Sequence, residues 1–179
     1  MKQARNKGVA DSKRPKVVWV IRAGKNGEAH DQFLRDGVIA LADAGLGDLK
    51  KHSMTRESIC TRYRMAHPKE SMRGSAGSSG KFYRFSNEMQ IGDLVLYPAS
   101  KLRRVYIAEV VGEYEFASER RAELPHRRKV RWIGSVDSSV FSIFARREMG
   151  AARTFFSVKT NVKELNQILE QREFEPVRQ

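Results

Sequence analysis

Alternation along residues 106–116 constrains the fold more than any other feature of this 179-residue chain. The even positions carry Tyr, Ala, Val, Gly, Tyr and Phe, while the odd positions include Glu109, Glu113 and Glu115. A period of two predicts a β-strand with one dry face and one acidic, wet face, because a helix repeats every 3.6 residues. Gly112 is expected to introduce a bulge that bends this strand.

The residues before this strand complete a β-hairpin. Gly92-Asp93 is a turn signal, and the apolar residues 94–97 predict a short strand. Pro98 is expected to end that strand, because proline has no amide hydrogen to donate to a ladder. Residues 101–104 form a short basic turn between the two strands. The sequence therefore predicts a hairpin over residues 91–116.

Apolar runs and helical periodicity place the other elements. Further strands are expected at residues 17–21, 38–42, 126–133 and 154–158. In the strand at 126–133, Val130 and Trp132 are expected to face the core, and Lys129 and Arg131 the solvent. Helices are expected at residues 28–36, 55–67, 82–89 and 161–171. Asn26 is expected to cap the first of them and Gly37 to end it, and Ser53 or Thr55 is expected to cap the second. The stretch 68–79, rich in serine and glycine, predicts a linker. This order predicts an α+β protein, a small mixed β-barrel with helices packed on the outside.

Length and charge bound the organisation. The chain fits one domain, residues 17–172, with a flexible basic arm at 1–16 before it and a tail at 173–179. One cysteine, no signal peptide and no long apolar run predict a cytoplasmic location away from membranes. The 34 Lys and Arg against 21 Asp and Glu give a net charge of +13. Such an excess favours a polyanionic partner, first of all nucleic acid.

The sequence gives no support for catalysis. The histidines and Cys60 show no metal-ligand spacing, so no metal site is expected. Residues 24–27 follow a strand but match neither a dinucleotide loop nor a phosphate loop, although their amides could face an anion. Asp48-Leu49-Lys50 matches the tail of a D/E-x-K nuclease motif, but no partner acid lies on a preceding strand. We therefore expect a binding protein, not an enzyme, without a cofactor.

Basic residues gather on the hairpin turn, on the following polar loop and on the strand after it. The predicted phosphate contacts are Lys101, Arg103, Arg104, Arg127, Arg128 and Lys129, and the same group includes Arg120, Arg121 and Arg131. Adjacent strand ends would bring many of them to one side, and each phosphate contact would make binding more sensitive to salt. A solvated charged face is the alternative interpretation.

Aromatic residues add a second element to this surface. Trp19 and Tyr97 lie on strands that we expect to be neighbours, and Arg22-Ala23-Gly24 leaves the end of one of them. Stacking surfaces beside free backbone groups are what an extruded base requires. Core packing is the competing interpretation of Trp19.

Five stretches together resemble one known module: WVIRAGKNGEAHDQFL, GVIALADAGLGDL, RFSNEMQIGDLVLYP, IAEVVGEYEF and HRRKVRWIG. Over about residues 17–134 the chain is similar to the N-terminal domains found ahead of Mrr-like nucleases in bacterial restriction proteins. Those domains belong to the PUA superfamily, with the EVE and YTH domains as relatives. The resemblance implies a small barrel that binds nucleic acid and holds one extruded, usually modified, base in a pocket.

The resemblance also implies which residues build that pocket. They are Trp19, Arg22, Ala23, Gly24, Leu41, Ala42, Asp43, Tyr97 and Pro98. EVE and YTH relatives commonly carry a second aromatic residue near the end of the second strand, where this chain has only aliphatic residues. We therefore expect a pocket that is half aromatic and half aliphatic. The nuclease domain expected downstream is absent from these 179 residues, so we expect a separate nuclease effector, a stand-alone reader or an excised domain.

The leading hypothesis is a reader of modified DNA that acts as the recognition part of a modification-dependent restriction system. It would grip the phosphates of a duplex and hold one flipped base, with modified cytosine, such as 5-methylcytosine, preferred over N6-methyladenine. The alternative is an RNA-binding PUA-like module with a stacking surface for single strands. A D/E-x-K nuclease is the third and least favoured hypothesis.

Overall fold

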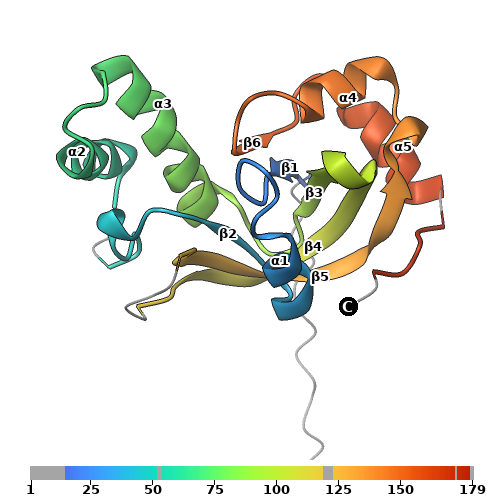
Figure 1. The fold of residues 1–179 in the computed structure, drawn as a ribbon, viewed down its shortest axis with the longest axis horizontal. Helices are drawn as coiled ribbons and strands as arrows, with labels where there is room; N and C mark the ends of the chain where they lie inside the picture. The colour runs from blue at the N-terminus through green and yellow to red at the C-terminus, as the bar shows by residue number, and fades with distance from the viewer. Residues whose placement is uncertain (1–14, 52–53, 119–122, 172, 178–179) are drawn as a thin grey trace, which may run out of the picture.

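A six-stranded mixed sheet forms the centre of the protein (Figure 1). The computed structural model describes residues 15–51, 54–118, 123–171 and 173–177, so the predicted arm lies almost wholly outside the described residues. The strands are β1 (Val18–Ile21), β2 (Val38–Leu41), β3 (Leu94–Ala99), β4 (Arg104–Phe116), β5 (His126–Asp137) and β6 (Phe155–Ser157). They are ordered β2-β5-β4-β3-β1-β6, and β1 runs parallel to β3 while the other neighbours are antiparallel.

Helices cover both faces of this sheet. They are α1 (His30–Asp36), α2 (Arg56–Ala66), α3 (Met72–Tyr83), α4 (Ile143–Met149) and α5 (Val162–Gln171). A π-helical turn, Arg84–Glu88, continues α3, and short 3-10 turns lie at Ala44–Leu46, Ser100–Leu102 and Ser138–Val140. In Figure 1, α2 and α3 stand on one side of the molecule, and α4 and α5 on the other.

Two hydrophobic cores result, one on each face of the sheet. Strand β1 contributes to both, because Trp19 and Ile21 pack into one core while Val18 and Val20 pack into the other. The first core includes residues of α1, α2 and α3, and the second includes residues of α4 and α5. Strand β1 is therefore buried on both faces, as its continuous apolar run predicts.

The predicted hairpin is confirmed, and so is the bulge. Strand β4 pairs with β3 along its first half and with β5 along its length, with a register shift between Val110 and Tyr114 that spans Gly112. A Cβ atom on Gly112 would lie 2.8 Å from the Cβ of Lys129, so the close approach there requires glycine. The prediction that Pro98 ends its strand is wrong, because Pro98 still pairs with Val105.

The α+β class is confirmed, but the sheet does not close into the expected barrel. Strands β2 and β6 are its two edges in the part of the chain that the structure describes. A second core lies on the face of the sheet that α4 and α5 cover, so both faces of the open sheet are packed. The expected strand at 154–158 is present as β6, but it pairs only with β1.

The expected linker at 68–79 is helical instead. Ser71 caps α3 by accepting a hydrogen bond from the amide of Gly74. Ser75, Ser79 and Gly80 are buried, and α3 packs against α2. Small side chains let helices approach closely, so packing outweighs the poor helix propensity of serine and glycine here.

The cap predictions are partly confirmed. Thr55 caps α2 by accepting from the amide of Ser58, and Gly37 ends α1 in the left-handed conformation with φ of 60°. Asn26 does not cap α1, because its amide groups hydrogen-bond the carboxylate of Glu28 instead.

Candidate nucleic-acid interface

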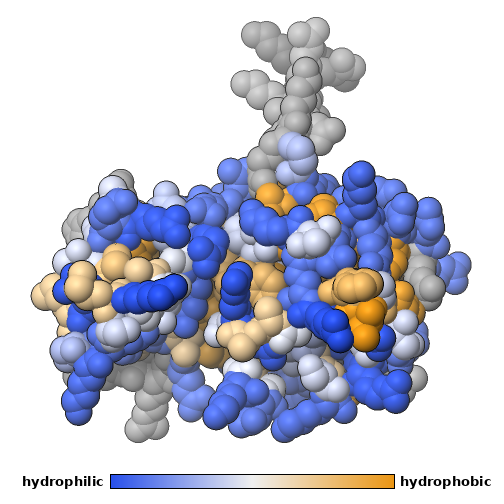
Figure 2. Space-filling model, turned by 90° about the horizontal axis from the view of Figure 1, so that it is seen from above, coloured by the Kyte–Doolittle hydropathy of each residue, from blue (hydrophilic) through white to orange (hydrophobic). Residues whose placement is uncertain are grey.

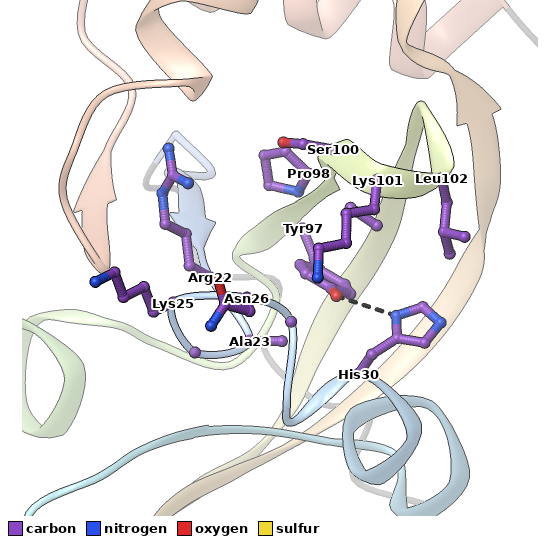
Figure 3. A pocket seen from close by; sticks show the side chains of 13 residues that line it. Arg22, Ala23, Lys25, Asn26, His30, Tyr97, Pro98, Ser100, Lys101 and Leu102 are labelled. Carbon is purple, nitrogen blue, oxygen red and sulfur yellow. Dashed lines mark hydrogen bonds between the residues drawn. The ribbon is translucent and has the colours of Figure 1, made fainter.

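A cavity of about 400 Å³, which we call the loop pocket, lies where β1 and β3 end side by side. Residues 22–27 after β1, His30 of α1 and residues 97–102 at the end of β3 form its walls. The register pairs Val18 with Leu94 in parallel, so both carboxyl ends reach the same edge of the sheet. This geometry brings the two segments together although they lie far apart in the sequence (Figure 3).

The 22–27 loop has a fixed shape. Gly24 and Gly27 both have positive φ, 83° and 86°, which side chains rarely tolerate. The Glu28 carboxylate folds back and accepts hydrogen bonds of 3.0 Å from the amide and from Nδ2 of Asn26. Hydrogen bonds from the backbone amides of Glu28 itself and of Asn26 hold the pKa of this carboxyl below its usual value. The loop is therefore organised before any ligand arrives.

Arg22 joins the loop pocket to the segment that follows α4. Its Nη2 donates to the carbonyl oxygens of Gly150 (2.7 Å) and Ala151 (2.9 Å), just after α4. Its amide also donates to the carbonyl of Thr154, which continues the β1–β6 pairing. The segment 150–154 is therefore held close to the start of the 22–27 loop.

A buried phenol forms part of the loop pocket. The hydroxyl of Tyr97 hydrogen-bonds Nδ1 of His30 at 3.0 Å, and the ring stacks on Tyr106 with 5.6 Å between centroids. Burial raises the pKa of Tyr97 to about 12, so the phenol stays neutral and keeps its hydrogen. Pro98 and Leu102 add apolar surface. The pocket thus combines an aromatic hydroxyl, aliphatic walls and backbone groups, as binding sites for planar polar ligands do.

Two further cavities extend the loop pocket toward α3. One of about 620 Å³ shares Arg22, Gly24 and Lys25 with it and reaches Leu41, Ala42 and residues 150–154. The next, of about 440 Å³, shares Lys81 and residues 152–154 and reaches Arg56 and Arg84. We call the three together the basic cleft. Figure 2 looks onto the side where α3 and β6 lie and shows hydrophilic side chains around a paler, more apolar centre.

The cleft is strongly cationic. Its basic side chains are Arg22, Lys25, Arg56, Lys81, Arg84, Lys101 and Arg153. Among the described residues, no aspartate or glutamate lines any of the three cavities. Cavity walls of one charge sign focus the electric field and concentrate ions of the opposite sign, so this cleft attracts anions.

The structure brings together most of the predicted pocket residues, but not all of them. Arg22, Ala23, Gly24, Tyr97 and Pro98 all line the loop pocket. Leu41 and Ala42 line the middle cavity of the basic cleft. Trp19 and Asp43 lie elsewhere.

Trp19 is a core residue, so its assignment to the pocket needs correction. Its side chain is 2% exposed, stacks on Phe155 at 4.9 Å, and donates from Nε1 to the buried carboxylate of Asp93 at 2.8 Å. The same carboxylate accepts hydrogen bonds from the amides of Val17 and Gln90. Trp19 therefore ties β1 to the turn before β3 and presents no face to a ligand.

Asp43 is also structural. Its carboxylate pairs with Nε2 of His67 at 2.7 Å, and its carbonyl accepts from Nε2 of His126 at 2.9 Å. Its φ of 107° is unusual for a residue other than glycine. These contacts join the end of β2 to α2 and β5, away from the loop pocket.

The predicted phosphate contacts do not form one patch. Lys101 lines the loop pocket and Arg103 is exposed beside it in sequence, whereas Arg127 and Lys129 lie at the far end of the hairpin. The register pairs Arg104 with Asp137 but Arg127 with Glu115, so the two groups are separated by about 30 Å of strand. Arg120 and Arg121 lie outside the described residues.

Several of these cations already have protein partners. Arg104 forms an ion pair with Glu175 at 2.8 Å, Lys129 lies 3.8 Å from Glu115, and Arg131 pairs with Glu109. Arg127 donates from Nε to the carbonyl of Leu124 at 2.9 Å. Acidic side chains and backbone carbonyls thus already pair with many of the basic side chains on β4 and β5.

Arg128 is wrong as a phosphate contact, because it is 1% exposed. Its guanidinium donates to the carbonyls of Phe85 and Met89 at 2.8 Å, and to those of Ser86 and Gly112 at 3.2 Å. Three of these carbonyls belong to the π-helical turn and the residue after it, where backbone acceptors lack helical partners. Burial lowers the pKa of this guanidinium, but arginine remains charged.

Sequence reasoning missed five cations of the cleft: Lys25, Arg56, Lys81, Arg84 and Arg153. Three of them, Arg56, Lys81 and Arg84, come from α2, α3 and the π-helical turn. Lys81 and Arg84 are three residues apart, a spacing that places side chains on one helix face. The expected helix at 82–89 begins one residue after Lys81, so it does not predict this pairing, which depends on α3 and the π-helical turn being continuous.

The chain belongs to the family described as Domain of unknown function (DUF8426), which matches residues 19–159. The matched region contains all the residues of the basic cleft. No curated protein matches the chain. Among the described residues, no group of His, Cys, Asp and Glu could hold a metal ion, and no helix is long and apolar enough to cross a membrane.

Proposed function

We propose that this protein binds nucleic acid along the basic cleft and holds one extruded base in the loop pocket. The observation that carries this proposal is the cleft itself, which has seven basic side chains and no described carboxylate along its walls. At one end of it lies a pocket with a neutral phenol and apolar walls. Phosphates would meet the cations, and a base would meet the pocket.

The loop pocket suits a base for two reasons. Its volume of about 400 Å³ lies within the range of small-molecule sites, and the hydroxyl of Tyr97 is held in place by its hydrogen bond to His30. The hydroxyl of Tyr97 and the backbone of the 22–27 loop can hydrogen-bond the edge of a base, while Pro98 and Leu102 contact its faces. Because several walls are aliphatic, an added methyl group gains about 1 kcal/mol when it packs there.

The ligand is duplex DNA with a modified base, with modified cytosine preferred over N6-methyladenine, in a restriction system that works with a separate nuclease effector. The support for this part is the resemblance of the quoted motifs to the PUA superfamily. We also propose that the open, bulged sheet is a variant of the PUA-type barrel, in which β2 and β6 remain apart. No catalytic step is assigned to this chain.

Binding of fluorescent duplexes tests the proposal. Matched duplexes with one plain, methylated or hydroxymethylated cytosine, and one with N6-methyladenine, are titrated at two salt concentrations. A preference of about fivefold or more for a modified duplex is expected, because one well-packed methyl group contributes about 1 kcal/mol. Equal affinity for all duplexes at fixed salt would refute base reading. Preference for single-stranded RNA over every duplex would favour the RNA-binding alternative.

Two variants separate the two parts of the surface. Leu102→Ala removes an apolar wall that is 52% exposed, so it should reduce the modification preference and leave the salt dependence unchanged. Lys25→Gln should keep the preference but lower the slope of log affinity against log salt by about 0.9. Val111→Ala on β4 and Arg147→Gln on α4 are matched controls, since both positions are exposed and neither lines the cleft.

A further inference from the structure

The cavity at the α3 end of the basic cleft gathers four cations from separate parts of the chain. Arg56 opens α2, Lys81 lies near the end of α3, Arg84 begins the π-helical turn, and Arg153 precedes β6. All four line this cavity of about 440 Å³, and no carboxylate does so among the described residues. We call this cavity the arginine pocket.

The cations of the arginine pocket have no direct polar partner on the protein. Within the part of the chain that the structure describes, none of the four side chains forms a hydrogen bond or an ion pair, and the carboxylates of Asp43, Glu70 and Glu88 act on Lys81 and Arg84 only from a distance. The Nε–H of Arg84 is shut off from water and has no acceptor. Lys81 and Arg153 lie over the rings of Phe82 and Phe156, and these cation–π contacts supply no acceptor oxygen to either cation.

The arrangement is electrostatically costly without a ligand. Burial lowers the pKa of Arg84, and the neighbouring charges of Arg56 and Arg153 lower it further, against an opposite effect of Glu88. Burial also lowers the pKa of Lys81. Cations that repel one another in a half-buried cavity stabilise an anion strongly, because the anion relieves the repulsion of all of them at once.

Gly80 allows this arrangement. A Cβ atom there would lie 3.3 Å from Nη1 of Arg84 and 3.5 Å from Nη2 of Arg56, so both guanidinium groups lie over the same bare stretch of α3. Glycine inside a helix is less favourable than alanine, because it loses more backbone freedom on folding. The helix therefore bears a cost at the position where two guanidinium groups come together.

We propose that the arginine pocket is a phosphate-binding site. Planar guanidinium groups match the oxygen atoms of phosphate with paired hydrogen bonds. The three arginines of the pocket carry such groups, and the Nε–H of Arg84 has no acceptor among the described residues. Three arginines and a lysine exceed what a single carboxylate needs, whereas a phosphate offers three or four acceptor oxygens. The phosphate is a group of the nucleic acid in the cleft, which is the one point that depends on the proposed function.

Thermal unfolding with inorganic phosphate tests the site without nucleic acid. Phosphate should raise the midpoint of the wild-type protein above that in chloride of equal ionic strength. Arg56→Gln and Arg153→Gln, both at exposed positions, should each weaken phosphate binding on the order of tenfold, because each removes one charge-assisted hydrogen bond. Arg147→Gln removes the same charge outside the cleft and should bind phosphate like the wild type. Equal stabilisation by chloride, or an unchanged response of Arg153→Gln, would overturn the proposal.

Short oligonucleotides then identify the source of the phosphate. Stronger inhibition of phosphate binding by a 5′-phosphorylated dinucleotide than by its unphosphorylated form assigns the site to a terminal phosphate. Equal inhibition by both assigns it to an internal phosphodiester, and inhibition by neither overturns the link to nucleic acid. A protein that binds phosphate here but ignores base modification retains the arginine pocket and refutes only the proposed reading of the base.

Discussion

Replacing Arg128 with alanine gives the sharpest test of the corrected site. If Arg128 contacted phosphate, the change would weaken DNA binding and leave the fold intact. The structure instead predicts a folding defect, because the guanidinium is 1% exposed and donates to four backbone carbonyls. It joins β5 to the π-helical turn after α3 and to the bulge of β4.

The magnitude follows from the acceptors left behind. Three of the four hydrogen bonds, those to Phe85, Ser86 and Met89, are buried. Each buried acceptor without a donor costs about 1–3 kcal/mol, which gives a range of about 3–9 kcal/mol for the three. Truncation also removes the cost of burying a charge, so the lower part of this range applies. We expect Arg128→Ala to lower the free energy of unfolding by about 3–5 kcal/mol, a large part of the 5–15 kcal/mol typical of a domain.

Urea denaturation measures this loss, with Arg127→Ala as the matched control. Arg127 is the preceding residue of the same strand, is half-buried and makes a single hydrogen bond to Leu124. Its removal should cost about 1 kcal/mol. A loss below about 1 kcal/mol for Arg128→Ala, or equal losses for the two variants, would refute the structural role of Arg128.

Three further predictions follow from single contacts. Trp19→Phe should lower the free energy of unfolding, measured by urea denaturation, by about 1–3 kcal/mol, because the buried Asp93 loses a hydrogen-bond donor. The variant should keep the preference among DNA duplexes. Loss of that preference would show that Trp19 belongs to the base pocket after all. Burial lowers the pKa of His126 below its ordinary value of 6.5. As the pH falls, the unfolded protein therefore binds a proton at this histidine before the folded protein does, and the free energy of unfolding should fall below about pH 6.5. His126→Asn should flatten this fall between about pH 7.5 and 5.5, and an unchanged slope would contradict it. Gly24→Ala should lower the thermal unfolding midpoint more than Gly92→Ala. Both positions have positive φ, but only at Gly24 would the new Cβ collide with a carboxylate oxygen, that of Glu28. Equal shifts of the midpoint would contradict the close packing of the 22–27 loop.

Local patterns predicted the sheet well where one face is buried and the other is wet. The alternation after Tyr106 and the turn at Gly92 identified the central hairpin, and Gly112 identified its bulge. Closure was not predictable in this way, because it depends on whether β2 and β6 meet; β2 is apolar throughout and β6 has only three residues, so neither has an alternation that identifies its neighbour. The second core depends on α4 and α5, and the sequence predicts only α5 of these two helices, at residues 161–171.

The helix α3 shows where composition misleads. Serine and glycine favour turns in isolation, so residues 68–79 resemble a linker. Their burial against α2 reverses this preference, since Ser75, Ser79 and Gly80 supply the small surface that the neighbouring helix needs. The helix expected at 82–89 contains Arg84 but not Lys81, so the sequence did not show that both cations lie on one continuous helical stretch beside the cleft.

Arg128 shows the opposite case: the strand alternation correctly predicts a buried position, but the charge of the side chain favours a surface position. Val130 and Trp132 were expected to face inward, and a period of two places Arg128 on the same face. Val130 is buried as expected, and Arg128 is too. Its charge suggested a surface position, although a buried arginine is stable when carbonyls surround it.

Charge distribution, more than net charge, decides where an anion binds on this protein. The cations of β4 and β5 face acids on the opposite strand: Arg131 pairs with Glu109, and Lys129 with Glu115. Cross-strand pairs of this kind cancel most of the local field at the salt concentration of a cell. The cations of the basic cleft come from α2, α3 and two loops, and no acid lines the cleft among the described residues. Under the proposed function, a polyanion approaches at this cleft, and strand β3 of the hairpin ends at the loop pocket.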